Sequence, residues 1–311
     1  MADRNNRNLP RGGFRPDVIV ELPVQEPTKL LEHLIKSMPD RKRTGIKQML
    51  AHNQVAVNGK PERQFDMELT PSDSVKVNFT REFKVFYNRR LKIVYEDDDI
   101  IVVNKGYGLL SMGNDKNPDD TAYSILKNYV KWSNPMNKIF IIHRLDRDTS
   151  GLMMFAKTME AKERMQHNWN NMVLERNYVA VVEGAIENPE GTVRSYLAET
   201  SQYEVYSTDN PEKGQLAVTR YKTLQSNGRF SLVEVSLDTG RKNQIRVHMH
   251  DLGNPISGDR KYGAGASPLH RLALHARTLR FVHPITGEKM DFNTPIPSGF
   301  LSITRRRYSA D

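Results

Sequence analysis

Residues 139–156 read I-F-I-I-H-R-L-D-R-D-T-S-G-L-M-M-F-A. Two apolar runs, residues 139–142 and 151–156, enclose a segment that contains a histidine, two arginines and two aspartates. Short apolar runs bounded by polar turn residues are typical of strands buried in a sheet. The pattern predicts two core strands, the first of which ends at Asp146 and places this carboxylate at the mouth of the sheet. A polar turn in which Asp146 or Asp148 is an ordinary cap explains the charged segment equally well.

On both sides of this segment, residues 93–304 mix strand and helix patterns. Further strands are predicted at residues 100–103, 178–182 and 230–237. Helices are predicted after Asp120-Thr121, over residues 159–171 behind the cap residue Thr158, and over residues 244–252, where Gly253 ends the helix. Strands that pair through short turns, mixed with a few helices, indicate an α+β domain with a mixed, mainly antiparallel sheet flanked by helices.

The composition limits the classes of protein that fit. The chain has 311 residues, a formal net charge of +9 and no cysteine. The charge favours a polyanionic partner, nucleic acid or an acidic membrane surface, although a soluble basic protein fits it too. The absence of cysteine excludes disulfides and thiolate chemistry. No apolar run is long enough to span a bilayer, and the polar start lacks the apolar core of a secretory signal, so we expect a cytoplasmic protein.

The N-terminal part divides into a tail and a basic module. Residues 1–28 are rich in Arg, Asn, Gly and Pro, and we expect a disordered tail. Residues 29–80 predict a compact module with a helix near Leu30, a basic helix over residues 41–50, and a strand that enters a turn at Asn58-Gly59. Residues 81–92 are expected to be a linker, and residues 305–311 a basic tail.

Positive charge is dense in this module. Between residues 29 and 60 there are seven Lys or Arg against two Asp or Glu, a net charge of +5. Such a density predicts contact with phosphates. The residues predicted to bind RNA here are Arg41, Lys42, Arg43, Lys47 and Lys60. Together with residues 53–60 and 72–77, the basic helix resembles the S-four-like domain, a small α/β RNA-binding domain. Asn53 and Ser72 occupy positions where that family usually has glycine, and asparagine tolerates positive φ.

Several motifs in the larger part resemble one family of enzymes. H-R-L-D-R-D-T-S-G at residues 143–151 matches the signature H-R-L-D-x-x-T-S-G of the RluA-type pseudouridine synthases. Seven further segments resemble motifs of that family and occur in the expected order. One precedes the signature, V-N-K-x-x-G at 103–108. The others follow it: E-R-N-Y at 175–178, T-G-R-K-N-Q-I-R-V-H at 239–248, G-N-P-I at 253–256, G-D at 258–259, L-H-A at 274–276 and H-P at 283–284. Gly106 departs from the family, which usually has proline there.

The resemblance implies a reaction and a fold. Members of the family convert uridine in RNA to pseudouridine on a pseudouridine synthase fold: the base is detached, rotated and rejoined to the sugar through a carbon–carbon bond. They use no metal, nucleotide or organic cofactor, and monomers are usual. The extra S-four-like module favours large-subunit ribosomal RNA as the substrate, because resembling enzymes with that domain often act there. Transfer RNA remains an alternative.

The resemblance also implies site residues. Asp146 matches the essential aspartate, which either attacks the sugar or removes a sugar proton to give a glycal. Arg246 matches the arginine that pairs with this carboxylate, and a guanidinium can hold such a group charged and aimed. Tyr178 matches a tyrosine that stacks on the target base, although a core tyrosine is an alternative. Arg144 matches a residue inserted beside the flipped nucleotide, although a surface ion pair would explain it too.

Other classes of protein fit parts of the sequence less well. A non-catalytic RNA- or ribosome-binding protein would use the basic module alone and would not need Asp146, Tyr178 and Arg246. A glycosidase needs two carboxylates at a set separation. In the charged segment, Asp146 and Asp148 are the only close pair, and the motif that they adjoin requires Asp146 alone. His248 and His250, spaced i and i+2, lie on different faces of a helix and do not predict a metal site. Ser150 lacks the glycine-flanked turn of a hydrolase nucleophile, and His143 is predicted to be a hydrogen-bonded scaffold residue.

Overall fold

The computed structural model describes residues 18–83, 86–113, 119–132 and 134–305. The chain divides into two compact units. One consists of residues 1–86 with 130–137, and the other of residues 87–129 with 138–311. Among the described residues, no helix is long and apolar enough to cross a membrane.

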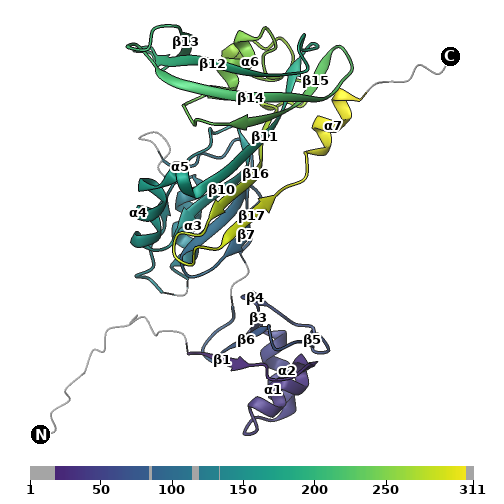
Figure 1. Ribbon diagram of the computed structural model, residues 1–311. Helices are drawn as coiled ribbons and strands as arrows, with labels where there is room; N and C mark the ends of the chain where they lie inside the picture. Colours follow the sequence, from purple (N-terminus) through teal and green to yellow (C-terminus); the bar gives the residue numbers. More distant parts are fainter. Residues whose placement is uncertain (1–17, 84–85, 114–118, 133, 306–311) are drawn as a thin grey trace, which may run out of the picture. The chain divides into compact units, whose positions relative to one another are not determined.

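The first unit packs two helices against small sheets (Figure 1). Its four-stranded sheet has the order β1-β6-β3-β4, and a second ladder pairs β2 with β5. The elements are β1 (Ile19–Pro23), β2 (Thr28–Lys29), α1 (Leu30–Ser37), α2 (Arg43–Ala51), β3 (Val55–Val57), β4 (Lys60–Pro61), β5 (Glu68–Leu69) and β6 (Ser74–Asn78). Leu30, Leu34 and Ile46 are fully buried in the core of the unit. The predicted turn is confirmed, since Asn58 and Gly59 have φ of 50° and 76°.

One boundary of this unit was predicted wrongly. Residues 1–17 of the expected tail lie outside the described residues, but residues 19–23 form β1, which pairs antiparallel with β6. Val18, Ile19 and Val20 are 52%, 41% and 40% exposed, so the local sequence carries little burial signal. The strand is formed by backbone hydrogen bonds to residues more than fifty positions away, which composition does not reveal.

The second unit is built on one large sheet of eleven strands (Figure 1). Its main path runs β13-β12-β14-β15-β11-β16-β10-β8-β7, with β17 paired to β16 and β9 paired to β10. The strands are β7 (Leu91–Glu96), β8 (Ile100–Lys105), β9 (Phe140–Ile141), β10 (Ser150–Ala156), β11 (Val173–Glu183), β12 (Glu190–Glu199), β13 (Val205–Thr208), β14 (Gln215–Ser226), β15 (Phe230–Leu237), β16 (Leu274–Val282) and β17 (Lys289–Asn293). Among these strand pairs only β10 and β16 run parallel. The predicted α+β class with a mixed, mainly antiparallel sheet is confirmed.

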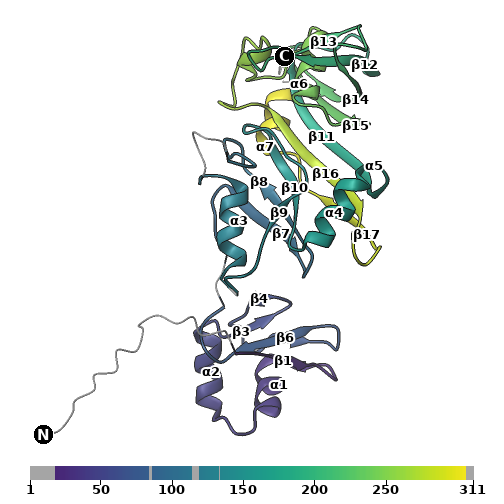
Figure 2. The same ribbon diagram turned by 90° about the vertical axis from the view of Figure 1, so that its left-hand side faces the viewer.

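Helices lie beside this sheet (Figure 2). They are α3 (Ala122–Val130), α4 (Met159–His167), α5 (Trp169–Met172), α6 (Gln244–Asp251), the 3-10 turn η1 (Arg260–Tyr262) and α7 (Ser298–Thr304). The hydroxyl of Thr158 accepts the N–H of Ala161 at 3.2 Å, as predicted for the cap of α4. The helix predicted over residues 159–171 is instead two helices that meet at Asn168. Gly253 has φ of 78° just after α6, which confirms the predicted end.

The strand predicted to end at Asp146 is shorter than expected. Regular pairing covers only Phe140–Ile141, and the chain from residue 142 to residue 147 is irregular. The reason lies in His143, whose Nε2 accepts the backbone N–H of Met154 at 3.0 Å. A side chain thereby takes the place that a backbone carbonyl would have in the ladder. The predicted linker also ends early, because Leu91 begins β7 and is 1% exposed.

Candidate active site

Asp146 lies in the irregular segment that joins β9 to β10. Two contacts hold this segment against residues of the chain after β8. The hydroxyl of Ser111 donates to the carbonyl of Leu145 at 2.6 Å and accepts the N–H of Leu145 at 3.1 Å. The N–H of Thr149 donates to the carbonyl of Asp146 at 3.2 Å, which closes a turn. The Asp146 side chain is 30% exposed, so a substrate can reach it.

Gly151 brings this segment close to β16. It has φ of +117°, a conformation that residues with a Cβ rarely adopt. A Cβ at this position would lie 2.1 Å from the carbonyl oxygen of Ala276 and 2.5 Å from its nitrogen. No other residue type fits between the two parallel strands. Gly151, the last of the small residues after Asp146, thus permits the close approach of β10 to β16.

Arg246 joins two carboxylates. It projects from α6, and its Nη1 lies 3.5 Å from Oδ2 of Asp146. Its Nε and Nη2 each donate to one carboxylate oxygen of Asp259 at 2.7 Å, and Nη1 also donates to the side chain of Asn243 at 3.1 Å. Asp259 is 1% exposed, and the ring of Tyr262 lies under the guanidinium with its centroid 4.9 Å from Cζ. The bidentate pair fixes the plane of the guanidinium and aims Nη1 at Asp146.

Arg246 keeps its positive charge at neutral pH. Burial would lower the pKa of this guanidinium, but the hydrogen bonds and the negative charge of Asp259, together with Asp146, raise it above its ordinary value. A permanent positive charge therefore lies beside Asp146. The structure therefore brings together Asp146 and Arg246, two of the three residues predicted to be catalytic.

Tyr178, the third, reaches the same region through the sheet. Four residues form one row across neighbouring strands of the sheet. Tyr178 of β11 pairs with Ala276 of β16, and Ala276 pairs with Gly151 of β10. Gly151 pairs in turn with Lys105 of β8. Tyr178 is 9% exposed. Burial raises its pKa, and the charge of Asp146 acts in the same direction while Arg176 opposes it. The phenol is therefore protonated at neutral pH.

Lys105 is a buried cation that sequence reasoning did not identify as part of the site. It is fully buried, and Nζ donates to the carbonyls of Gly106, Leu109 and Arg147 at 3.1, 2.8 and 3.1 Å. Burial lowers its pKa to about 7, against the favourable charges of Asp148 and Asp146. Its three hydrogen bonds tie the loop after β8 to the residue next to Asp146. The only signal in the sequence was its place in the segment at 103–108.

His143 has the predicted scaffold role. Besides the bond to Met154, its ring lies 5.1 Å from that of Trp169, centroid to centroid. Burial, together with the nearby charge of Arg176, lowers its pKa to about 3, so the imidazole is neutral at physiological pH. Because Nε2 accepts the backbone N–H of Met154, this nitrogen has no proton to donate.

The residues predicted to bind RNA fall into two groups. Arg144 is exposed on the same segment as Asp146. The others belong to the first unit, where Lys42, Arg43 and Lys60 are exposed. Arg41 and Lys47 lie over aromatic rings, with 4.8 Å from the Arg41 guanidinium carbon to the centroid of Phe79 and 5.5 Å from the Lys47 ammonium to that of Phe65.

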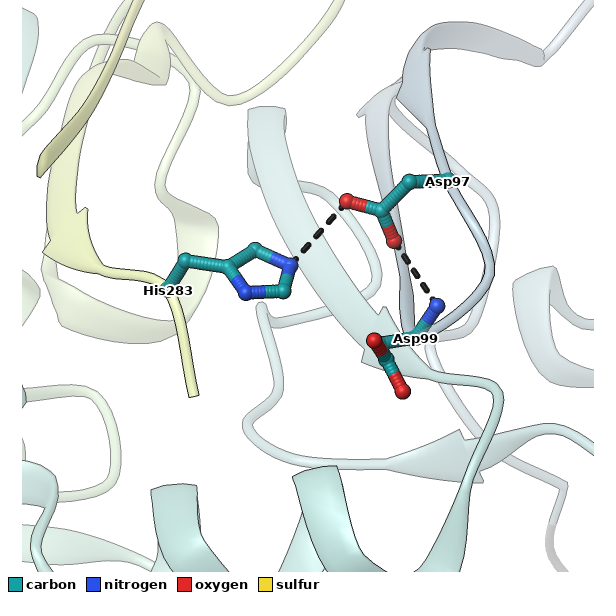
Figure 3. A group of neighbouring side chains, drawn as sticks. All are labelled: Asp97, Asp99 and His283. Atoms are coloured by element: carbon teal, nitrogen blue, oxygen red, sulfur yellow. Dashed lines mark hydrogen bonds and ion pairs between the residues drawn. The ribbon is translucent and has the colours of Figure 1, made fainter. Parts of the chain in front are cut away.

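The side chains that resemble a metal site are already engaged. Within the described parts of the chain, Asp97, Asp99 and His283 form the group whose ligand atoms lie within 4.8 Å of one another (Figure 3). Nδ1 of His283 accepts the N–H groups of Ile285 and Thr286, so its Nε2 carries the proton and donates to Asp97 at 3.0 Å. With no free nitrogen on the imidazole, this group joins two turns rather than presenting a metal site.

His248, which was not predicted to bind a metal, likewise has both ring nitrogens next to hydroxyl groups. Its two nitrogens lie 2.8 Å from the hydroxyl of Thr219 and 3.1 Å from that of Ser195.

Comparisons with known proteins agree with this geometry. The family described as RNA pseudouridylate synthase matches residues 99–251. The chain is 35% identical over 221 residues to the uncharacterized RNA pseudouridine synthase YhcT of Bacillus subtilis (strain 168), covering 70% of this chain and 73% of that protein. It is 32% identical over 292 residues to the ribosomal large subunit pseudouridine synthase D of Escherichia coli (strain K12), covering 88% of this chain and 89% of that protein. The solved structure of human RNA pseudouridylate synthase domain containing 4 superposes with a TM-score of 0.57 at 25% identity, covering 68% of this chain and 90% of the human one.

These matches define the class of protein. The chain belongs to the RNA pseudouridine synthases, of the RluA type indicated by its motifs. It is an isomerase that acts on RNA, and a purely non-catalytic binding protein is no longer a competing interpretation.

Proposed function

We propose that this protein isomerises specific uridines of large-subunit ribosomal RNA, with Asp146 as the essential carboxylate and with the target base flipped out of its stack. The observation that carries the proposal is the bridge in which Arg246 is oriented by Asp259 and presents Nη1 3.5 Å from Asp146. A partly exposed carboxylate beside a fixed guanidinium is held in one place and is open to whatever enters the site. Both forms of the reaction, attack on the sugar and proton removal to a glycal, start from an ionised carboxylate.

Tyr178 supplies a flat, buried ring next to this carboxylate. Because burial raises its pKa, the group is a neutral phenol in the free enzyme and a poor base. Stacking on the uracil, and hydrogen bonding through the hydroxyl, fit this state better than removal of the 5-carbon proton by Tyr178 alone. Proton removal at that carbon would need a group that is basic at neutral pH.

Arg144 is proposed to occupy the space left by the flipped base. It is exposed, and it precedes Asp146 by two residues on an irregular segment that Ser111 anchors. An enzyme that acts on a base within a stack must extrude it, and a planar guanidinium can stack on the neighbouring bases and contact phosphate.

The choice of RNA rests on the first unit and on one relative. The first unit carries the predicted cations Arg41, Lys42, Arg43, Lys47 and Lys60, and we propose that it is an S-four-like RNA-binding domain. The relative from Escherichia coli, by its name, acts on the ribosomal large subunit, and its similarity covers 88% of this chain. Transfer RNA is the second candidate substrate. We place the reaction in the cytoplasm, with the protein as a monomer and without a cofactor.

Release of tritium from RNA labelled at the uridine 5-carbon tests these proposals. Large-subunit ribosomal RNA and transfer RNA would be assayed separately with the wild type, Asp146→Asn and Asp148→Asn. Asp148→Asn is the matched control, because it removes the same charge from the same loop at a residue that pairs with Arg147 instead of Arg246. We expect release from ribosomal RNA, loss of release in Asp146→Asn with RNA affinity retained, and release kept in Asp148→Asn. Release that persists in Asp146→Asn would contradict the role of the carboxylate, and release from transfer RNA alone would overturn the substrate.

A further inference from the structure

Arg176 lies where three motifs of the sequence meet. It is half-buried on β11, two residues before Tyr178. Its guanidinium carbon is 5.5 Å from the centroid of the Trp169 ring, and that ring packs on His143. A Cβ added to Gly240 would lie only 2.6 Å from Nη1 of Arg176, so the guanidinium rests against the backbone that leads into α6. The residue is thus fixed by an aromatic ring on one side and a glycine on the other.

The guanidinium nevertheless has no anionic partner. Among the described residues, none forms a hydrogen bond or an ion pair with the guanidinium of Arg176, whose side-chain contact is the face of Trp169. The comparison with Arg280, opposite Glu175 on the adjoining strand, is instructive: Arg280 donates to Glu175 at 2.6 Å and to Asp291 at 2.8 Å. The face of Trp169 attracts this cation but accepts no hydrogen bond from the edge of the guanidinium, so the donors of Arg176 remain available. Such a group is suited to an anion that the substrate supplies.

Arg176 lies close to two residues of the Asp146 region, since Trp169 packs on both Arg176 and His143 and Tyr178 follows two residues later on β11. Its positive charge opposes the raised pKa of Tyr178 and contributes to the lowered pKa of His143, which precedes Arg144 in the Asp146 segment. Gly240, against which it rests, also lines a pocket of about 470 Å³ whose charged residues are Lys213, Arg241, Lys242, Glu199 and Glu212. Lys242 is paired with Glu199, which leaves Lys213 and Arg241 as the pocket's cations without an ion-pair partner among the described residues. The pocket that adjoins Gly240 therefore carries a small net positive charge.

We propose that Arg176 binds a backbone phosphate of the RNA strand that flanks the target nucleotide, with the pocket beside Gly240 receiving the strand beyond it. This inference rests on the proposed function, since it assumes that the reacting nucleotide is held at Asp146. A guanidinium presents paired donors that match two phosphate oxygens, and Trp169 behind it limits the positions it can take. Arg176 is a positioning residue for the substrate, distinct from Arg246, whose donors are used on Asp146, Asp259 and Asn243.

The test measures binding and turnover separately. Dissociation constants for a large-subunit ribosomal RNA fragment would be measured over a series of salt concentrations in the Asp146→Asn background, which removes turnover. Arg176→Gln is expected to weaken binding about tenfold and to reduce the slope of log K against log salt by about 0.7 to 0.9, the loss of one phosphate contact. In the otherwise wild-type chain, the KM for tritium release should rise by the same factor with kcat within about twofold. Arg176→Lys should restore part of the affinity and all of the slope, because it keeps the charge.

Two further variants sharpen the result. Arg280→Gln removes the same charge from the neighbouring strand at a residue already paired with two carboxylates, and it should leave binding and slope unchanged. Gly240→Ala places a methyl group against Nη1 and should weaken binding in the direction of Arg176→Gln. An unchanged slope in Arg176→Gln, with a lower kcat and a shifted alkaline limb of the pH profile, would overturn the proposal and assign Arg176 to Tyr178 instead. Because binding needs no turnover, this result is independent of whether the wild type releases tritium, which tests the proposed function.

Discussion

Among single residues, Asp259 shows how a buried carboxylate can act through its neighbour. It touches no open space, yet both of its oxygens accept from Arg246 and thereby set the direction of the nitrogen that faces Asp146. The sequence shows this aspartate only as part of a short Gly-Asp segment. Its partner is thirteen residues away across a turn, so the pair becomes visible only when α6 and η1 are in place.

Asp259→Asn should therefore lower kcat while leaving RNA affinity near that of the wild type. Asparagine offers one acceptor oxygen where the carboxylate offers two, so Arg246 loses its bidentate bond. Misplacement of a reacting group by about 1 Å can cost about a hundredfold in rate. Tritium release at saturating RNA would measure the loss. The control is Asp238→Asn, which breaks a comparable pair with Arg220 on the surface and should change the rate less than twofold. A wild-type rate in Asp259→Asn would remove the positioning role.

Lys105 gives a prediction for stability against pH. Its pKa falls from 10.5 to about 7 in the folded chain because the group is buried. Between these values the unfolded chain binds a proton that the folded chain does not, so the free energy of unfolding should rise as pH rises from about 7 toward 10.5. Lys105→Met removes this contribution and should flatten the pH dependence over that window. It also leaves three carbonyls without their donor, at a cost of about 3 kcal/mol. Denaturant unfolding at a series of pH values checks both effects, and identical pH slopes in the two proteins would contradict the account.

Among helices and strands, the success of prediction depended on where an element finds its partners. Phe230–Leu237 is predicted to the residue, since its apolar run is buried and bounded by turn residues. The sequence does not predict β12 and β14, whose alternating exposed positions carry few apolar residues. Their ladder joins Glu190 to Lys222 and continues through eight residue pairs, so backbone pairing between segments supplies what local pattern lacks.

The site divides in a similar way. Asp146, Tyr178 and Arg246 follow from motif resemblance, because each lies within a distinctive run of residues. Lys105 and Asp259 do not, because their importance lies in contacts that only the folded chain brings together. Lys105 reaches the carbonyl of a residue forty-two positions away. Residue type at one position does not reveal a contact of that kind.

Gly151→Ala should disrupt the junction of β10 and β16. The added Cβ would overlap the backbone of Ala276, and the backbone conformation of Gly151 is unfavourable for alanine. Two effects of this kind together should lower the free energy of unfolding by about 4 kcal/mol or more. The same change at Gly45, in α2 with nothing within 4 Å of the added carbon, should instead stabilise the first unit by about 0.5 to 1 kcal/mol. Denaturant titrations measure both, and a Gly151→Ala protein as stable as the wild type would contradict the close approach of the strands.

At the scale of the whole molecule, the two units have separate hydrophobic cores, and we expect them to have separate roles in RNA binding and in the chemical step. The first unit has its own buried cluster, which includes Val55 and Val75. Its predicted RNA-binding side chains are exposed on α2, at residues 41–42 just before it, and on β4. The second unit contains Asp146 with its partner Arg246, and also Lys105 and Tyr178. We therefore expect the cations of the first unit to contribute to RNA affinity and not to the chemical step at Asp146.

A variant with glutamine at Arg41, Lys42, Arg43 and Lys47 tests this division. If each cation neutralises one phosphate, each contact contributes about 0.7 to 0.9 to the slope of log K against log salt. Loss of the four contacts should therefore reduce the slope by about 3. The KM for full-length ribosomal RNA should rise steeply, while kcat at saturation stays within about twofold, because the partners of Asp146 within the second unit are unchanged. Lys36→Gln is the control, since Lys36 is already paired with Glu26 at 2.8 Å and should not alter the slope. Circular dichroism would show that α2 still forms without the contacts of Arg41 and Lys47 to aromatic rings. A loss of kcat with an unchanged salt slope would show that these cations serve the chemical step, and the division between the units would be wrong.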